Sequence, residues 1–455
     1  MEPPSKGKRL ILFPVPLEGH INPMLKLANL LYSKGFSITI IHTQFNSPNP
    51  SLHPHFTFQS IPDGLSETEA SPKDIILLFS LFNTKCVQPF KECLSSLLSE
   101  EPVACLISDS IFHFTQSVAE SFKLPRIVFE TGSMTCYAVF THFPLLREKG
   151  YLPVTQDSQS ERAVKELPPL RIKDLPVIPK SDQEKYFELC VLIVTKIAAS
   201  DGVIFNTFRD LEEQGLETLQ KQYPNLPVFP IGPFHKCVPE EASSSTSDQS
   251  CISWLNTQAP NSVIYVSFGT IAAITKAQFL EIAWGLGNSN QPFLWVVRPG
   301  LVHGSNWLEP LPKGFLENLN GRGHIVKWAP QKEVLAHPSV GAFWTHNGWN
   351  STLESVCEGV PMICLPCFSD QLVLARYVSK VWKIGLQFEN EIERGEIEGT
   401  IRKLMEEKEG GEIRDRSMKL MEKANVCCRP GGSSYQCLDG LVEHILSFEV
   451  SKISS

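Results

Sequence analysis

The stretch from Trp328 to Gln371 constrains the fold most, because short apolar runs alternate there with turn residues. It reads WAPQKEVLAHPSVGAFWTHNGWNSTLESVCEGVPMICLPCFSDQ. The pattern predicts, in order, a helix over Lys332–His337, a strand over Val340–Trp344, a helix over Thr352–Glu358 and a buried strand over Met362–Leu365. A strand, a helix and a second strand in this order indicate an α/β sheet.

A polar cluster, Thr345 to Ser351, lies where the predicted strand leads into the predicted helix. Free backbone N–H groups and the helix dipole favour an anion at such a place, so the cluster predicts a phosphate site. Gly348 would allow close backbone approach, and His346, Asn350 and Ser351 would donate hydrogen bonds. A simpler interpretation stays open, in which Ser351 and Glu354 only form a capping box for the helix.

The N-terminal part predicts a second α/β unit. A strand over Arg9–Pro16 is followed by a turn over Leu17–His20, a helix over Met24–Tyr32 and a strand over Ser37–His42. His20 lies in the turn, where it is either an ordinary polar residue or a candidate base.

Asp109 follows another predicted strand, Val103–Ser108, and could simply cap the next helix, Ile111–Phe122. A further strand is predicted over Arg126–Glu130. Aromatic and aliphatic residues between positions 133 and 200 are either core or the lining of a pocket.

The C-terminal half repeats the alternation. Ser262–Gly269 and Phe293–Arg298 are predicted strands on either side of a helix over Lys276–Leu286. A Gly-x-Gly-x-x-Gly fingerprint and a Walker A sequence are both missing, which argues against a nicotinamide dinucleotide enzyme. Pro239 to Gln249 is Ser-rich and acidic, and it predicts an interdomain linker.

Composition limits the remaining classes. The chain has 455 residues, which favours two domains, and its net charge of −8 argues against nucleic acid as a partner. An apolar run of about 18 residues, enough to span a membrane, does not occur. The 13 cysteines show no zinc-ligand spacing, and without a signal-peptide pattern we expect reduced thiols in a cytoplasmic protein.

The stretch from Trp328 to Gln371 resembles, without a gap, the signature box of plant family-1 UDP-sugar-dependent glycosyltransferases. Gly19-His20-Ile21-Asn22-Pro23 is similar to the Gly-His-x-x-Pro turn of the same family, with Glu18 where Gln is common. The segments FPVPLEGHINPMLKLANLLYSKGFSITIIHTQFN and IPDGLSE resemble the branch with cytokinin and diterpene-glycoside glucosyltransferases.

The resemblance implies an α/β protein of the GT-B fold, with two Rossmann-like domains facing across a cleft. The acceptor domain would span residues 1–238, the linker 239–250 and the UDP-sugar domain 251–432. A terminal helix, about 433–455, would pack back on the first domain.

The resemblance also implies a role for each site residue. His20 would be the catalytic base and Asp109 would orient it. The UDP-sugar would be bound by Thr131, Ser267, Trp328, Ala329, Gln331, His346, Trp349, Asn350, Ser351, Glu354, Asp370 and Gln371. Glu18, Phe112, Cys136 and Phe140 are candidates for the acceptor pocket.

The implied activity is inverting transfer of glucose from UDP-glucose to a hydroxyl or carboxyl of a small plant metabolite, such as a terpenoid, a phenolic or one of their glycosides. We expect a monomer that needs neither a metal nor another cofactor. An N-glucosyltransferase of cytokinin-like heterocycles, a catalytically silent sugar-nucleotide sensor and an NAD-dependent oxidoreductase are the alternatives.

Overall fold

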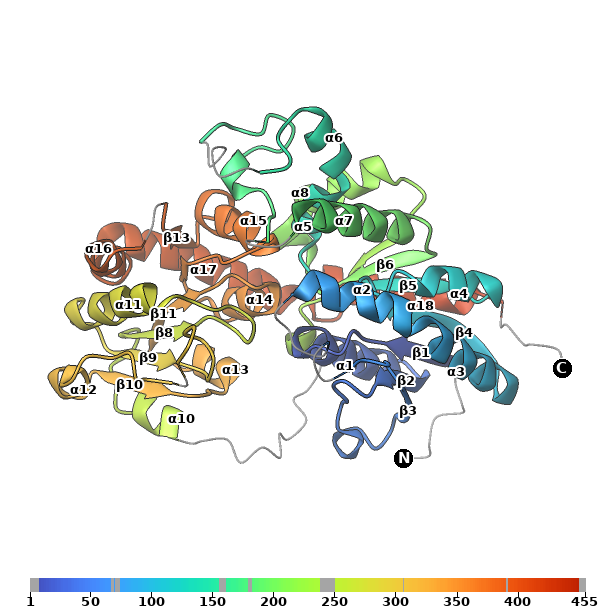
Figure 1. The fold of residues 1–455 in the computed structure, drawn as a ribbon, viewed down its shortest axis with the longest axis horizontal. Coiled ribbons are helices and arrows are strands. Elements are labelled where there is room, and N and C mark those ends of the chain that lie inside the picture. Colours follow the sequence, from blue (N-terminus) through green and yellow to red (C-terminus); the bar gives the residue numbers. More distant parts are fainter. Residues whose placement is uncertain are drawn as a thin grey trace. The chain divides into compact units, whose positions relative to one another are not determined.

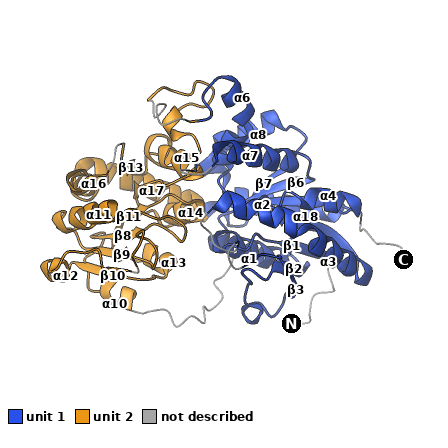
Figure 2. Ribbon diagram, in the orientation of Figure 1, with its two compact units in different colours: residues 1–153, 178–239, 426–455 blue, residues 154–177, 240–425 orange. Residues whose placement is uncertain are grey.

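The computed structural model describes residues 8–66, 69, 74–154, 161–178, 182–237, 250–305, 307–389 and 392–449. These residues form two compact units, coloured separately in Figure 2. Unit 1 comprises residues 1–153, 178–239 and 426–455, and unit 2 comprises residues 154–177 and 240–425. The predicted linker lies outside the described residues apart from Ser250, the first residue of a helix.

Unit 1 is built on a seven-stranded sheet in which every pair of neighbouring strands is parallel. In spatial order the strands are β3 (Thr57–Ile61), β2 (Ser37–Thr43), β1 (Arg9–Phe13), β4 (Val103–Asp109), β5 (Arg126–Glu130), β6 (Gly202–Phe205) and β7 (Val228–Pro230).

Helices cover both faces of this sheet (Figure 1). Successive side chains of a strand point to opposite faces, so Leu10 and Leu12 of β1 pack on one side and Ile11 and Phe13 on the other. The first side is covered by α1 (Glu18–Ser33), α9 (Phe234–Cys237) and α18 (Ser433–Ser447). The second is covered by α2 (Ile75–Lys85), α3 (Val87–Glu100) and α4 (Thr115–Ser121).

A further cluster in unit 1 joins β5 and β6 to three helices: α5 (Met134–Thr141), α7 (Gln183–Ala198) and α8 (Arg209–Gln222). The short helix α6 (Phe143–Glu148) follows α5. α18 is anchored by Leu438, Leu441 and Ile445 in the core and by an ion pair between Lys34 and Asp439.

Unit 2 is built on a six-stranded sheet, again parallel throughout. In spatial order the strands are β10 (Gly323–Val326), β9 (Phe293–Val296), β8 (Val263–Ser267), β11 (Val340–Thr345), β12 (Met362–Cys364) and β13 (Gly385–Gln387). Its helices are α10 (Ser250–Leu255), α11 (Lys276–Asn288), α12 (Phe315–Asn318), α13 (Gln331–Leu335), α14 (Trp349–Glu358), α15 (Asp370–Arg376), α16 (Arg394–Glu406) and α17 (Lys408–Cys427), the last of which runs on into unit 1.

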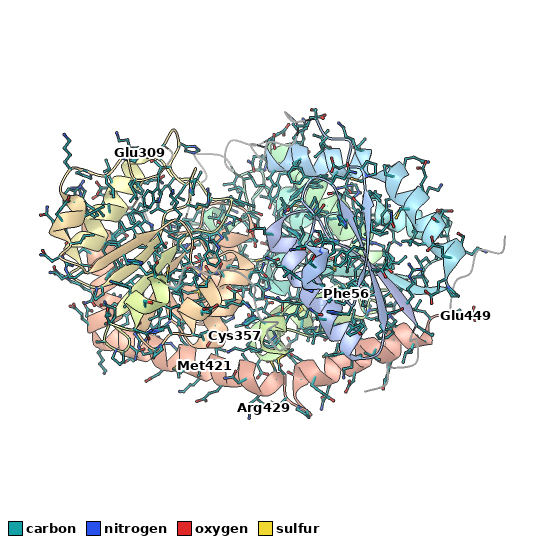
Figure 3. The ribbon with its side chains drawn as sticks, turned by 90° about the horizontal axis from the view of Figure 1, so that it is seen from below. Phe56, Glu309, Cys357, Met421, Arg429 and Glu449 are labelled. Carbon is teal, nitrogen blue, oxygen red and sulfur yellow. A yellow bond between two sulfur atoms is a disulfide. The ribbon has the colours of Figure 1, made fainter. Side chains whose placement is uncertain are left out.

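Gly359 ends α14 in the left-handed conformation, with φ of 67°, where a side chain would be strained. The sulfur atoms of Met418 and Met421 on α17 lie against it. Figure 3 labels Met421 on α17 and Cys357 on α14. The sharp end of α14 therefore leaves room for α17 to pass.

Two parallel sheets with helices confirm the predicted α/β class. β5 matches its predicted bounds, whereas β3 and β10 were not predicted. The first helix begins at Glu18 instead of Met24, because the backbone N–H groups of His20 and Ile21 both bond to Leu17 O, at 2.8 Å each. Pro23 therefore lies inside the helix, where its ring nitrogen cannot donate the usual hydrogen bond to Gly19 O.

Residues 154–177, which we predicted to belong to the first domain, group with unit 2 instead. A network of ion pairs explains the difference. Arg171 pairs with Asp174 at 2.8 Å and with Glu389 at 2.9 Å, and Asp174 also lies 3.5 Å from Arg376. These ion pairs attach the segment around Arg171 and Asp174 to the rest of unit 2, and their partners become neighbours only in the folded chain.

The prediction of reduced thiols is wrong for one pair. Cys237 at the end of α9 and Cys428 after α17 form a disulfide, with Cα atoms 5.6 Å apart. The sequence separation of 191 residues hides this pairing. The other eleven cysteines are not in disulfides. Within the described ranges, none of the helices combines the length and hydropathy that a membrane crossing requires.

Candidate active site

In unit 1 the structure brings His20, Asp109 and Thr131 together. His20 lies in the first turn of α1, Asp109 ends β4, and Thr131 directly follows β5. The Nδ1 atom of His20 lies 2.8 Å from Asp109 Oδ2 and 3.0 Å from Thr131 Oγ1. The carboxyl ends of neighbouring parallel strands meet at one edge of a sheet, which explains why residues so far apart in sequence meet here.

Burial and backbone contacts fix the carboxylate of this pair. Asp109 is fully buried, and its other oxygen accepts a hydrogen bond from Ile111 N at 3.0 Å. An ionised carboxylate only accepts, so His20 must donate from Nδ1 and carry its lone pair on Nε2. A neutral histidine in this tautomer can take a proton at Nε2, and the Asp109 carboxylate then stabilises the imidazolium.

The four candidates for an acceptor pocket lie in different surroundings. Glu18 is exposed in the first turn of α1, and Phe140 is half-buried. Phe112 is fully buried and stacks on Phe13 with ring centroids 4.3 Å apart, so the prediction that it lines a pocket is wrong. Cys136 on α5 is also buried, with 1% of its surface exposed.

In unit 2 the ring of His346 lies in a slot between two glycines, just after β11. A Cβ atom on Gly269 would lie 2.6 Å from His346 Cε1, and one on Gly348 would lie 2.5 Å from Nε2. Gly269 also adopts φ of 69°, which favours glycine. The sequence pattern had suggested room for a ligand at Gly348, but the glycines first of all make room for the histidine.

Burial lowers the pKa of His346 to about 4, and the nearby positive charge of Arg298 acts in the same direction. A hydrogen bond with the backbone of Ser267 opposes them. The imidazole is therefore neutral at pH 7 in the ligand-free protein. It would meet a phosphate as a hydrogen-bond donor rather than as a fixed positive charge.

The helix after His346 begins earlier than predicted. Gly348 is the N-cap of α14, which places Trp349, Asn350 and Ser351 in the first turn. Ser351 is therefore not the N-cap, and the capping-box interpretation is wrong. The hydroxyl of Ser351 instead accepts a hydrogen bond from Gln331 Nε2 at 2.9 Å.

Gln331 also donates from Nε2 to Glu354 Oε2, at 2.8 Å. Gln331, the first residue of α13, thus connects two residues of α14 that the sequence placed in the nucleotide site. Trp328 stands nearby in sequence with 54% of its surface exposed, an unusual exposure for a tryptophan. An exposed indole offers a flat face on which a nucleobase can stack.

The other residues predicted to bind the UDP-sugar lie in the following surroundings. Ala329 and Trp349 are buried, at 6% and 4% exposure, and Ser267 ends β8. Asp370 begins α15 and is half-buried. Gln371 is buried, and its Oε1 accepts from Cys367 N at 2.9 Å, so its amide nitrogen is left as the donating end.

Sequence reasoning missed Arg298, which follows β9. Its Nε donates to Gly269 O at 2.8 Å, and Nη2 contacts Ala272 O. The guanidinium therefore holds the loop after β8 against the ring of His346. The only local sign of this role is an arginine at the end of the predicted strand Phe293–Arg298.

Among the residues that the structure describes, no three His, Cys, Asp or Glu side chains are grouped as metal ligands.

Comparisons with known proteins agree with this geometry. Residues 53–421 match the family of UDP-glucoronosyl and UDP-glucosyl transferases. The chain is 54% identical to UDP-glycosyltransferase 76B1 of Arabidopsis thaliana, across 96% of this chain and 98% of that one. It is 43% identical to the flavonol 3-O-glucosyltransferase UGT76E12 of the same plant, with 98% of each chain covered.

A solved structure gives the same result for the fold. UGT2 of Phytolacca americana, complexed with UDP-2-fluoro-glucose and pterostilbene, superposes with a TM-score of 0.85 at 29% identity. The match covers 97% of this chain and 100% of that chain. With its two parallel sheets, this chain therefore belongs to the plant UDP-glycosyltransferases of the GT-B fold and is a glycosyltransferase.

Proposed function

We propose that this enzyme transfers glucose from UDP-glucose to an oxygen atom of a small plant metabolite, with inversion at the anomeric carbon. The observation that carries the proposal is the 2.8 Å contact between His20 Nδ1 and Asp109 Oδ2. It leaves Nε2 as the basic nitrogen, which a hydroxyl acceptor needs and an inert sugar-nucleotide sensor does not.

The reaction would be one displacement. The acceptor oxygen attacks the anomeric carbon, the bond from that carbon to the β-phosphate oxygen breaks, and UDP leaves. The acceptor proton passes to His20 Nε2, and Asp109 stabilises the resulting imidazolium. A single displacement without a covalent sugar intermediate converts an α-linked donor into a β-glucoside.

Residues of unit 2 would bind the donor. Uracil would stack on Trp328 and pair with the backbone at Ala329, beside Gln331. Ribose hydroxyls would donate to the carboxylate of Glu354, which the amide of Gln331 holds in place. The diphosphate would be held by Ser267, His346, Asn350 and Ser351 together with the N-terminus of α14.

The sugar hydroxyls would contact Asp370, Gln371 and Trp349, with Thr131 as a further contact. Gln371 favours glucose, and the glucosyl donor analogue in the Phytolacca americana complex supports the same sugar. We propose that no metal is needed, because the helix N-terminus and the donors around His346 would stabilise the leaving diphosphate.

The acceptor is proposed to be an apolar alcohol, phenol or acid, or a glycoside of one. A relative named as a flavonol 3-O-glucosyltransferase supports the phenolic class. N-glucosylation of a cytokinin-like heterocycle is the alternative, because an amine nucleophile needs less help from a base.

The test is UDP release from UDP-glucose with phenols, terpenoid alcohols and acids, terpenoid glycosides and adenine-type cytokinins as acceptors. We expect turnover of an oxygen acceptor that falls at least about a hundredfold in His20→Ala. His55→Ala is the matched control, because that ring packs against Tyr32 and Phe56 away from the site.

Turnover of an oxygen acceptor that survives His20→Ala would overturn the role of the base. Turnover of a cytokinin alone, unaffected by the variant, would favour the N-glucosyltransferase. Binding of UDP without any turnover would favour the silent sensor.

A further inference from the structure

Glu130 places a second carboxylate beside the pair formed by His20 and Asp109. It is the last residue of β5. Its Oε1 accepts a hydrogen bond from Gly132 N at 2.8 Å, and the hydroxyl of Ser110 donates to the same carboxylate. The proposed mechanism assigns no role to the Glu130 carboxylate.

The two hydrogen-bond partners of Glu130 are the residues next to the two contacts of His20. Ser110 directly follows Asp109, and Gly132 directly follows Thr131. Both Asp109 and Thr131 lie within 3.0 Å of His20 Nδ1. The Glu130 carboxylate therefore ties together the two loops that hold the histidine ring.

Gly132 allows this arrangement. A Cβ atom at position 132 would lie 2.9 Å from Glu130 Oε1, closer than normal packing permits. The loop thus has space for the carboxylate where a larger residue would displace it.

The surroundings of Glu130 make its charge variable near neutral pH. Burial raises the pKa of Glu130 to about 7, against the hydrogen bonds from Gly132 and Ser110. The negative charge of Asp109 also raises the pKa of Glu130, whereas the interaction with His20 lowers it. This coupling is mutual, so an ionised Glu130 also stabilises the protonated form of His20.

Two other titratable groups face Glu130 from neighbouring helices, Tyr137 of α5 and Cys190 of α7. Burial raises the pKa of Tyr137 well above 10 and that of Cys190 to about 12. Both stay neutral between pH 5 and pH 9. His20 and Asp109 are therefore the charged groups with which Glu130 interacts in that range.

We propose that Glu130 is a positioning residue of the glucosyl transfer, which holds the loops around His20 and, when ionised, makes His20 a stronger base. This inference rests on the proposed function, because it needs His20 to accept the proton of the acceptor. It makes the enzyme sensitive to the protonation of a group that does not touch the substrate.

Replacing Glu130 by Gln separates the charge from the hydrogen bonds, because the amide oxygen can still accept from Gly132 and Ser110. Without the negative charge the imidazolium of His20 is less stable. The acid limb of kcat/KM should therefore move to lower pH, by about half a pH unit or more. The value on the plateau should fall about threefold to tenfold, because a weaker base removes the proton less readily.

The experiment is kcat/KM from pH 5 to pH 9 for the wild type, Glu130→Gln and the control Glu92→Gln, whose carboxylate lies on the surface of α3. We expect the shifted limb only in Glu130→Gln, with a thermal unfolding midpoint close to that of the wild type. A Glu130→Gln profile that overlays the wild-type profile would overturn the proposal.

Ser110→Ala provides a second test if Glu130→Gln does not fold. The loss of one donor favours the protonated form of Glu130, so the acid limb should move in the same direction by a smaller amount. An unchanged limb in this variant would also contradict the proposal. If His20→Ala retains turnover, the proposed function fails; if His20→Ala is inactive and neither limb moves, only the role of Glu130 fails.

Discussion

The side-chain nitrogen of Gln331 lies 2.8 Å from the carboxylate of Glu354, and this contact joins the start of α13 to the middle of α14. The carboxylate is thus held in place before any nucleotide arrives. A carboxylate fixed in this way can accept hydrogen bonds from both hydroxyls of a ribose at little entropic cost.

Glu354→Ala should weaken UDP binding about tenfold or more, because hydrogen bonds to a charged group contribute about 1.5–3 kcal/mol. Calorimetric titration with UDP measures the change. The control is Glu317→Ala, an exposed acid on α12. Equal loss of affinity in both variants would exclude a specific role for Glu354.

Gly348→Ala should reduce UDP affinity about tenfold, because the new Cβ would lie 2.5 Å from His346 Nε2 and push the ring aside. Its backbone angle, φ of −61°, accepts alanine, so any loss of stability, about 1–3 kcal/mol, should come from the displaced ring and not from backbone strain. Gly395→Ala is the control, since nothing lies within 4 Å of its Cβ. UDP affinity unchanged in Gly348→Ala would show that the ring position does not matter.

Gly269→Ala should destabilise the protein and weaken UDP binding together. Its φ of 69° disfavours a side chain, and the new Cβ would also meet the His346 ring at 2.6 Å. Gly321→Ala has the same kind of backbone strain, with φ of 79°, but no neighbour within 4 Å. Comparing the two by thermal unfolding and UDP titration separates the strain, about 1 kcal/mol, from the clash.

Stability should fall as the pH drops from about 6.5 to about 4. Burial lowers the pKa of both His346 and His113 to about 4. In this pH range the two histidines therefore bind protons in the unfolded chain but stay neutral in the folded protein, which favours unfolding. Above pH 6.5 neither group is protonated in either state, and their contribution to the pH dependence vanishes. Unfolding in urea at pH 7, 6 and 5 measures the slope.

His346→Gln should flatten this slope, because glutamine does not titrate. His303→Gln is a control in the same unit. A slope that is as steep in His346→Gln as in the wild type would contradict the assignment of the acid sensitivity to His346.

Arg171→Ala should destabilise unit 2 by about 3 kcal/mol, because it leaves the buried carboxylate of Asp174 with fewer partners. Limited proteolysis should then cut within residues 161–178 sooner than in the wild type. Arg209→Ala removes an exposed ion pair with Glu213 and should cost at most about 1 kcal/mol. Similar losses in the two variants would argue against a special role for the network.

Turnover should be unchanged by dialysis against EDTA, because the donors at the start of α14 would stabilise the leaving diphosphate without a cation. The measurement is UDP release before and after dialysis, with added Mg²⁺ as the control. Loss of activity that Mg²⁺ restores would show that a metal takes part.

Local sequence patterns predict most of the elements and the class of the fold. Buried strands such as β9 and β12 read as unbroken apolar runs, and turn residues mark where they end. These patterns are local, so periodicity was enough to predict two α/β sheets and to place the polar cluster from Thr345 to Ser351 at the start of a helix. The long match from Trp328 to Gln371 then identified the family.

Contacts between residues that are distant in sequence depend on the tertiary structure. His20 and Asp109 are 89 residues apart, and by residue type alone each had an ordinary interpretation, as a loop histidine and a helix cap. Three further features likewise depend on contacts between remote segments: the slot around His346, the grouping of residues 154–177 with unit 2, and the disulfide of Cys237 with Cys428. No local pattern encodes such contacts, because they form only when packing of the helices on the sheets brings those segments together.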